Sequence, residues 1–166
     1  MKTLCETLAR DHDYVMVDCP AGIEQGFRNA IAGANSAVIV TTPEVSAVRD
    51  ADRIIGLLEA AQLENPRLIV NRLKPDMVRR GDMMNVEDIR EILAVELLGV
   101  VPDDEAIIVS TNKGEPIVIR SSSLAGQVFL NISQRIMGQQ VPFLELDRPR
   151  GFLQRLKTIM GMGSRA

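Results

Sequence analysis

The sequence predicts an α/β protein built on a doubly wound, mainly parallel sheet. Short apolar runs rich in Val and Ile recur at residues 14–17, 37–40, 68–70 and 97–101, and longer segments with helical periodicity separate them. Continuous rather than alternating apolar residues suit strands that are covered on both faces. Because strands and helices alternate along the chain, we expect parallel strands joined by right-handed crossover helices.

The first crossover helix is predicted at residues 45–62. Four apolar residues at helical spacing mark its buried face: Val48, Ala51, Ile55 and Leu58. Thr42 is expected to cap this helix, with Pro43 at the first helical position. Two further amphipathic helices are expected at residues 86–93 and 124–136.

Length and composition indicate one soluble globular domain. The chain has 166 residues, of which 46% are hydrophobic and 25% charged. Cys5 and Cys19 have no paired spacing, which favours a reduced, cytoplasmic setting over a disulfide framework. The single histidine, His12, excludes a histidine-based metal site or catalytic triad.

Charge is distributed unevenly between the body and the C-terminus. Residues 1–147 carry a formal net charge of −8 and residues 148–166 one of +5, which together give the total of −3. An acidic body with a basic end is a poor general binder of nucleic acid. We therefore expect no specific nucleic-acid partner.

The basic tail, residues 148–166, predicts contact with a membrane surface. Five apolar side chains fall on one helical face, namely Phe152, Leu153, Leu156, Ile159 and Met160. Arg155 and Lys157 fall on the other side, where they would stay near the anionic headgroups. Residues 151–162 are thus a predicted membrane-targeting amphipathic helix, which is too short to span a bilayer. The alternative is a terminal helix that packs its apolar stripe on the domain.

Polar residues follow each apolar run at the expected carboxyl edge of the sheet, where ligands bind in open α/β sheets. The first run ends in Asp18 and, four residues later, Gly22. This spacing is typical of a Walker B to switch II segment, in which the carboxylate orients Mg²⁺ and the glycine allows close approach to a terminal phosphate. The alternative is an ordinary strand-to-loop turn.

Several segments together resemble the MinD and ParA family of ATPases, whose MinD members determine the division site in bacteria and plastids. They are residues 18–24, 42–53, 80–83, 99–104, 114–116 and 151–156. The resemblance implies a P-loop NTPase fold, incomplete here at its N-terminal strands. It divides the chain into a partial ATPase domain at 1–138, a linker at 139–150 and the membrane-targeting helix.

The resemblance also implies the cofactors ATP and Mg²⁺ and the residues that meet them. Asp18 would hold the magnesium shell through water, and Gly22 would lie near the γ-phosphate. Asn71 matches an adenine-contacting asparagine, and Pro102 and Asp103 match the loop that closes over the base. Two alternatives stay open from the residues themselves: Asn71 as a turn residue that ends a strand, and Asp103 as a helix N-cap.

A partner surface is implied on the helix at residues 45–62. Ser46, Asp50 and Asp52 match the surface that receives MinC-like and MinE-like proteins at the ATP-dependent homodimer. The alternative is that Asp50 and Arg53 form only a solvated i, i+3 ion pair. The resemblance places the complete protein in the cytoplasm and, peripherally, on the inner face of the cell membrane or in the plastid stroma.

One expected motif is missing from this sequence. No G-x-x-x-x-G-K-[ST] occurs, and none of the four lysines lies in a glycine-rich phosphate loop. ATPase activity is therefore expected of the complete family member rather than of this chain, which matches a C-terminal part. The alternative function is a nonenzymatic interaction fragment that keeps the partner and membrane surfaces. We also expect the isolated chain to be poorly soluble or partly unfolded, because strands next to the missing segment would lack partners.

Overall fold

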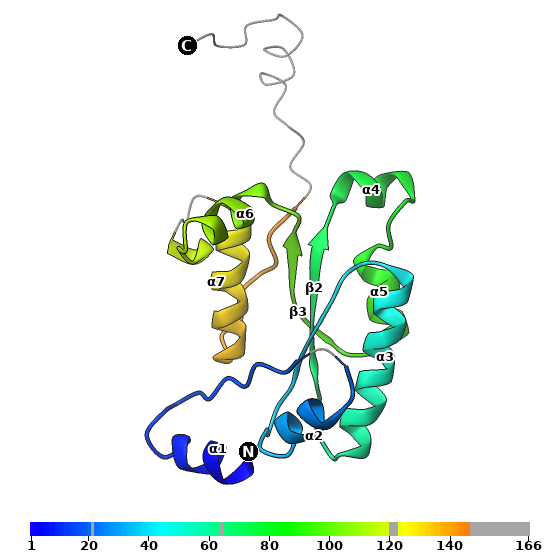
Figure 1. The fold of residues 1–166 in the computed structure, drawn as a ribbon. Helices are drawn as coiled ribbons and strands as arrows, with labels where there is room; N and C mark the ends of the chain where they lie inside the picture. Colours follow the sequence, from blue (N-terminus) through cyan, green and yellow to red (C-terminus); the bar gives the residue numbers. More distant parts are fainter. Residues whose placement is uncertain (21, 64, 120–122, 147–166) are drawn as a thin grey trace, which may run out of the picture.

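The computed structural model describes residues 1–20, 22–63, 65–119 and 123–146 (Figure 1). One sheet contains three parallel strands in the order β1-β2-β3, namely β1 (Val38–Thr41), β2 (Arg67–Leu73) and β3 (Glu96–Pro102). The register places Val38 beside Arg67 and Arg67 beside Glu96. Three of the four predicted strands are confirmed, and so is their parallel direction.

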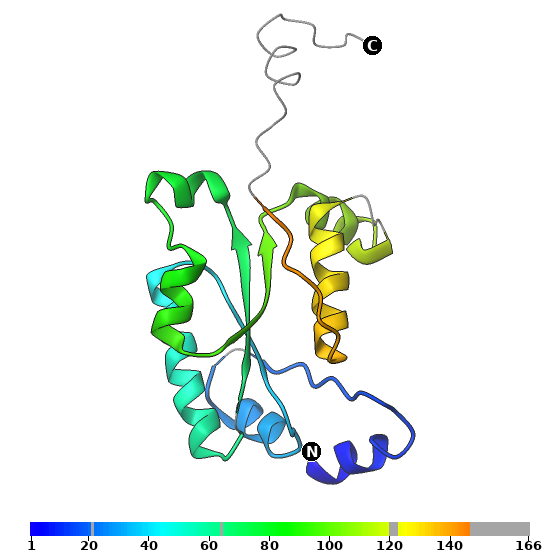
Figure 2. The same cartoon turned by 180° about the vertical axis from the view of Figure 1, so that it is seen from behind.

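Helices cover this sheet on both faces, which confirms the doubly wound arrangement. The helices that follow β1 are α3 (Val45–Ala60), α4 (Pro75–Arg80), α5 (Val86–Leu93), α6 (Glu105–Asn112), the 3-10 helix η1 (Ile117–Ile119) and α7 (Leu124–Ile136). Helices α3 and α5 lie on one face, whereas α6 and α7 lie on the other (Figures 1 and 2). Helices α5 and α7 have the predicted bounds, and α3 ends two residues earlier than expected.

The first apolar run does not form the predicted strand. Residues 14–20 have no regular secondary structure, and Tyr14 and Met16 are 55% and 75% exposed. A strand requires backbone hydrogen bonds from a neighbour, and none of the three strands in the described residues pairs with this segment. Two helices that the sequence analysis did not predict flank it, α1 (Lys2–Leu8) and α2 (Gln25–Ile31).

The start of α3 also differs from the prediction. Glu44 is the N-cap residue, and it caps the helix without a side-chain hydrogen bond. The Glu44 amide donates instead to the carbonyl of Thr42 at 2.8 Å, so Thr42 and Pro43 form a turn before the helix. The predicted cap was wrong, but the buried face of Val48, Ala51, Ile55 and Leu58 is confirmed.

The hydrophobic core lies on the two faces of the sheet. In β2 the alternation of side chains sends Leu68 and Val70, both fully buried, to the cluster under α3 and α5. Ile69 points the other way and joins the cluster under α7. The central strand is thus apolar on both sides, as its continuous run of apolar residues predicted.

Replacing Ile89 in α5 by alanine is expected to lower the free energy of unfolding by about 2–5 kcal/mol, because Ile89 is 0% exposed and a cavity would remain. Ile92→Ala is the matched control, since Ile92 lies on the same helix and is 53% exposed. It should cost no more than about 0.5 kcal/mol. Urea denaturation followed by circular dichroism measures both, and equal effects would contradict this assignment of the core.

After α7 the chain turns and runs along β3 (Figures 1 and 2). Leu144 and Leu146 are half-buried and pack on the core clusters. Residues 139–146 of the predicted linker therefore lie against the body rather than free of it. Residues 147–150 and the predicted helix at 151–162 lie outside the described residues, and the predicted domain limits stay predictions.

Candidate functional site

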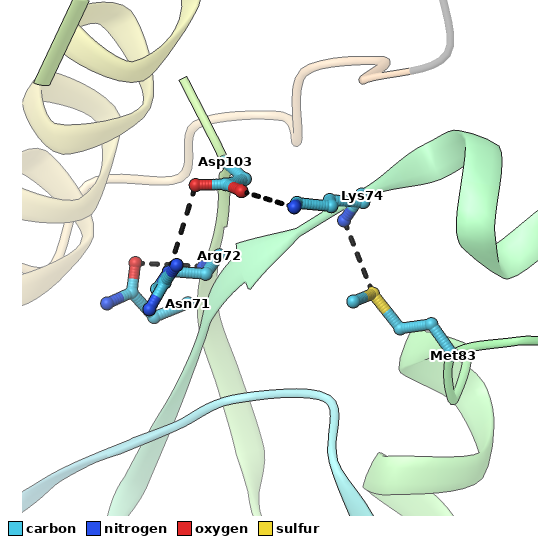
Figure 3. A network of polar contacts seen from close by, with 5 residues as sticks. All are labelled: Asn71, Arg72, Lys74, Met83 and Asp103. Atoms are coloured by element: carbon cyan, nitrogen blue, oxygen red, sulfur yellow. Dashed lines mark hydrogen bonds and ion pairs between the residues drawn. The ribbon is translucent and has the colours of Figure 1, made fainter. Parts of the chain in front are cut away.

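The carboxyl end of β2 has an irregular backbone that presents Asn71 and Arg72. The register between β2 and β3 shifts between Val70 and Leu73, and Arg72 adopts a left-handed conformation with φ of 59°. The Asn71 side-chain oxygen accepts a hydrogen bond from the Arg72 amide at 3.0 Å, which supports this irregularity (Figure 3). Asn71 thus lies within the end of β2, and its side-chain oxygen already has a local partner.

Asp103 lies directly opposite, just after β3, and is held by two cations, Arg72 of β2 and Lys74, which follows β2 as the N-cap of α4. Lys74 Nζ is 3.0 Å from one carboxylate oxygen, and Arg72 Nε is 3.8 Å from the other (Figure 3). The Asp103 amide also donates to the carbonyl of Leu73 at 2.9 Å. Because both basic side chains are well exposed, these ion pairs contribute little stability and are easily exchanged for another partner.

Asp104 rather than Asp103 caps the following helix, so the alternative of an Asp103 N-cap was wrong. One Asp104 oxygen accepts from the Ala106 amide of α6 at 2.9 Å, and the other accepts from the Ala125 amide of α7 at 3.3 Å. Pro102 is buried at the end of β3, opposite Leu73. Of the predicted pair, Asp103 therefore carries the side chain that a ligand at this edge would meet.

The structure does not bring Asp18 and Gly22 to this edge. Residues 12–20 lie well below the carboxyl ends of β2 and β3 in both views (Figures 1 and 2). Asp18 is exposed, and Gly22 has a left-handed φ of 99°. Within the described residues no group of three His, Cys, Asp or Glu side chains is arranged to hold a metal ion. The predicted magnesium role of Asp18 has no supporting geometry in this chain.

The predicted partner residues are all exposed on α3. Ser46 and Asp50 are four residues apart and share one face of the helix, whereas Asp52 lies more than half a turn away from Asp50. No ion pair joins Asp50 to Arg53 among the residues that the structure describes. The face is therefore available to a partner, but it is not a compact cluster.

The predicted membrane-binding residues lie outside the described residues, namely Phe152, Leu153, Arg155, Leu156, Lys157, Ile159 and Met160. In the part of the chain that the structure describes, no helix has the length and apolar character needed to cross a bilayer.

The sequence analysis assigned no role to the two basic residues of this edge, Arg72 and Lys74. Arg72 and Lys74 alternate with Leu73 after the apolar part of β2, so a period-2 pattern at the strand end was the available signal. Their contact with Asp103 depends on the register of β2 against β3, which the sequence alone does not reveal.

Comparison with protein families assigns this fold. Residues 1–137 match the ParA family model, described as the NUBPL iron-transfer P-loop NTPase. The chain belongs to the ParA family of P-loop NTPases. The α/β fold with a parallel sheet predicted from the sequence is therefore confirmed at the level of the family.

Within the ParA family the similarity is to MinD proteins. The chain is 58% identical over 146 residues to the septum site-determining protein MinD of Synechocystis, covering 87% of this chain and 55% of the relative. MinD in the MinC:MinD cell division protein complex of Aquifex aeolicus superposes with a TM-score of 0.83 at 44% identity, covering 87% of this chain and 60% of that chain. MinD of Pyrococcus horikoshii complexed with Mg-ADP gives a TM-score of 0.74 at 27% identity, covering 81% and 54%. The chain thus spans little more than half the length of these relatives.

Proposed function

We propose that this chain is the C-terminal part of a MinD-type ATPase that positions the division septum by ATP-dependent dimerisation, membrane binding and recruitment of a division inhibitor. The observation that carries the proposal is the identity of 58% with a septum site-determining protein over most of the chain. The partial ATPase domain would end near residue 138. The protein would be cytoplasmic and attach peripherally to the inner face of the membrane, or occupy the equivalent place in a plastid.

The residues at the carboxyl edge fit the adenine part of ATP. The Asn71 side-chain oxygen is engaged with the Arg72 amide, while its NH₂ group makes no hydrogen bond among the described residues. An amide donor of this kind can pair with a nitrogen acceptor on a purine edge. Asp103 is the second candidate, since its two exposed ion pairs exchange at little cost.

The residues of this chain do not fit the phosphate and magnesium part. Asp18 is the one predicted ligand for Mg²⁺, and no described carboxylate cluster surrounds it. The sequence contains no glycine-rich loop with a lysine to bind phosphates. We therefore assign this chain a role in binding the base, and the roles of Asp18 and Gly22 depend on a phosphate loop supplied by a complete protein.

The exposed face of α3 is the proposed partner surface. Ser46, Asp50 and Asp52 would meet MinC-like and MinE-like proteins, because exposed charge on a rigid helix steers encounter and fixes register. A MinC complex is known for the Aquifex aeolicus relative. Pairing of two ATP-bound copies would bring two basic tails to one anionic bilayer, where two weak attachments become one strong attachment.

Asn71→Asp in a completed protein is expected to weaken ATP binding roughly tenfold, because it removes a hydrogen-bond donor to the base. Asp keeps the oxygen that accepts from the Arg72 amide, so the end of β2 should stay intact. The completed protein joins this chain to the part of the Synechocystis relative that it does not match. Isothermal titration with ATP and Mg²⁺ measures the affinity.

Glu96→Gln is the control for Asn71→Asp, since it also changes charge by one unit, and Glu96 is exposed at the start of β3, the opposite end of that strand from Asp103. Unaltered ATP affinity in Asn71→Asp would remove Asn71 from the adenine site.

A nonenzymatic interaction fragment is the second candidate function, and the missing phosphate loop favours it for the chain as it stands. Such a fragment would keep the α3 surface and the basic tail without binding nucleotide. Equilibrium dialysis of this chain with ATP and Mg²⁺ separates the two functions. Saturable binding supports the nucleotide role, and its absence together with retained vesicle binding supports the fragment.

A further inference from the structure

One side chain holds the segment that follows α7. Arg135, in the last turn of α7, donates from Nε to the carbonyl of Val141 at 3.0 Å and from Nη2 to that of Pro142 at 2.9 Å. Its Nη1 donates to the carbonyl of Leu98 in β3 at 2.8 Å. The guanidinium carbon lies 4.0 Å from the centre of the Phe143 ring, within range of a cation–π contact. All three nitrogens of Arg135 are therefore engaged.

These contacts attach residues 141–146, which we call the strap, to the free edge of the sheet. Among the described residues strand β3 pairs with β2 alone, so the Leu98 carbonyl on its other side would lack a strand partner. The Arg135 guanidinium satisfies that carbonyl and two carbonyls of the strap at once. Burial lowers the pKa of Arg135 from its ordinary value, but an arginine stays charged throughout the physiological range.

Contacts before the strap and at its far end also fix its position. Before the strap, Arg67 Nη1 of β2 donates to the backbone carbonyl of Arg135 at 3.2 Å, which ties the end of α7 to the sheet. At its far end, Leu146 packs against both core clusters. In both views the strap ends at the level of the carboxyl ends of β2 and β3, the edge that presents Asn71 and Asp103 (Figures 1 and 2).

We propose that Arg135 is a positioning residue that fixes the point where the basic tail leaves the body, beside the candidate adenine site. The consequence for a membrane rests on the proposed function. If the strap is released, the predicted linker leaves the body at residue 139 rather than at residue 147. Its predicted length then rises from four residues to twelve, which lengthens its r.m.s. end-to-end distance from about 11 Å to about 19 Å. The held strap keeps the nucleotide edge close to the lipid surface.

Limited chymotrypsin digestion of this chain tests the positioning role without any membrane. Arg135→Lys keeps the charge, but one ammonium group cannot span three separate carbonyls and the aromatic ring. We expect cleavage after Phe143 and Leu144, two chymotrypsin sites in the strap, to be about tenfold faster, because the local opening free energy of the strap falls. Cleavage after Phe152 serves as an internal control and should not change. Mass spectrometry distinguishes the products.

Arg53→Lys is the matched control variant, because Arg53 is an exposed arginine of α3 and does not line the pocket that the strap and Arg135 share. Unchanged cleavage rates within the strap in Arg135→Lys, or the same increase in Arg53→Lys, would overturn the proposal. If Arg135→Lys does not fold, Phe143→Leu removes only the ring from the exposed side of the strap. Faster cleavage after Leu144 in that variant supports the proposal, and an unchanged rate counts against it.

Energy transfer on vesicles tests the consequence for the tail. A donor dye on Cys19, the exposed cysteine, reports its distance from acceptor dyes in vesicles of phosphatidylcholine and phosphatidylglycerol. Lower transfer efficiency in Arg135→Lys than in Arg53→Lys, at equal vesicle binding, supports a longer tether. Equal efficiency would contradict the positioning of the tail. Failure of the unmodified chain to bind vesicles would contradict the proposed membrane function, while the digestion result would still decide the role of Arg135.

Discussion

Leu156→Glu is expected to abolish recruitment of this chain to anionic vesicles. Burying a leucine side chain in the interface contributes about 1.5–3 kcal/mol, and a carboxylate both loses this contribution and repels anionic headgroups. Because a single short helix binds weakly, a loss of this size should reduce binding by well over tenfold. Phe152→Asp should act in the same way. Cosedimentation with phosphatidylglycerol vesicles measures the bound fraction.

Gln154→Glu is the matched control for Leu156→Glu. It introduces the same charge on the predicted polar side of the helix, so it should weaken binding only modestly through electrostatics. Unchanged cosedimentation of Leu156→Glu would contradict membrane attachment through this face. Equal losses in the two variants would show that net charge, rather than an amphipathic helix, governs binding.

Gly99→Val is expected to prevent folding of the body. A Cβ atom at Gly99 of β3 would lie 2.3 Å and 2.5 Å from Cγ1 and Cδ1 of Ile132 in α7, closer than packed atoms approach. Gly99→Ala alone should cost roughly 3 kcal/mol, since both residues are buried and the Ile132 side chain would have to leave its place in the core. The two further carbons of valine should raise this cost above the free energy of unfolding of a typical domain. Circular dichroism and urea denaturation measure the effect.

Gly56→Ala is the control for a glycine with open space around it. Nothing lies within 4 Å of a Cβ atom at Gly56, which is exposed in the interior of α3, so alanine should stabilise the protein by about 0.5–1 kcal/mol. A double variant with Gly99→Ala and Ile132→Ala should lose less stability than the sum of its single variants. Additive losses would contradict direct packing of α7 on Gly99.

Helical and strand periodicity predicted the elements that form through local patterns and burial. Helix α3 buries the four residues that its spacing marked, and α5 and α7 begin and end where the amphipathic pattern does. The continuous apolar run of β2 predicted burial on both faces, which Leu68 and Ile69 confirm. These features follow from the sequence because each depends on neighbours within a few residues.

Features that depend on distant partners could not be predicted in this way. Residues 14–17 have the composition of a strand, but none of the described strands pairs with them. Asp103 forms ion pairs with Arg72 and Lys74 because β2 and β3 lie side by side in a particular register. Arg135 reaches Leu98 across 37 positions of sequence, so its role appears only in the folded chain.

Nucleotide binding at the strand ends is expected to control attachment of the tail to lipid. The most direct test of this control is vesicle cosedimentation of the completed protein, this chain joined to the unmatched part of the Synechocystis relative, with and without ATP and Mg²⁺. We predict that ATP increases the bound fraction at least tenfold, because pairing of two tails multiplies weak affinities. Equal binding with and without ATP would contradict control of membrane attachment by the nucleotide.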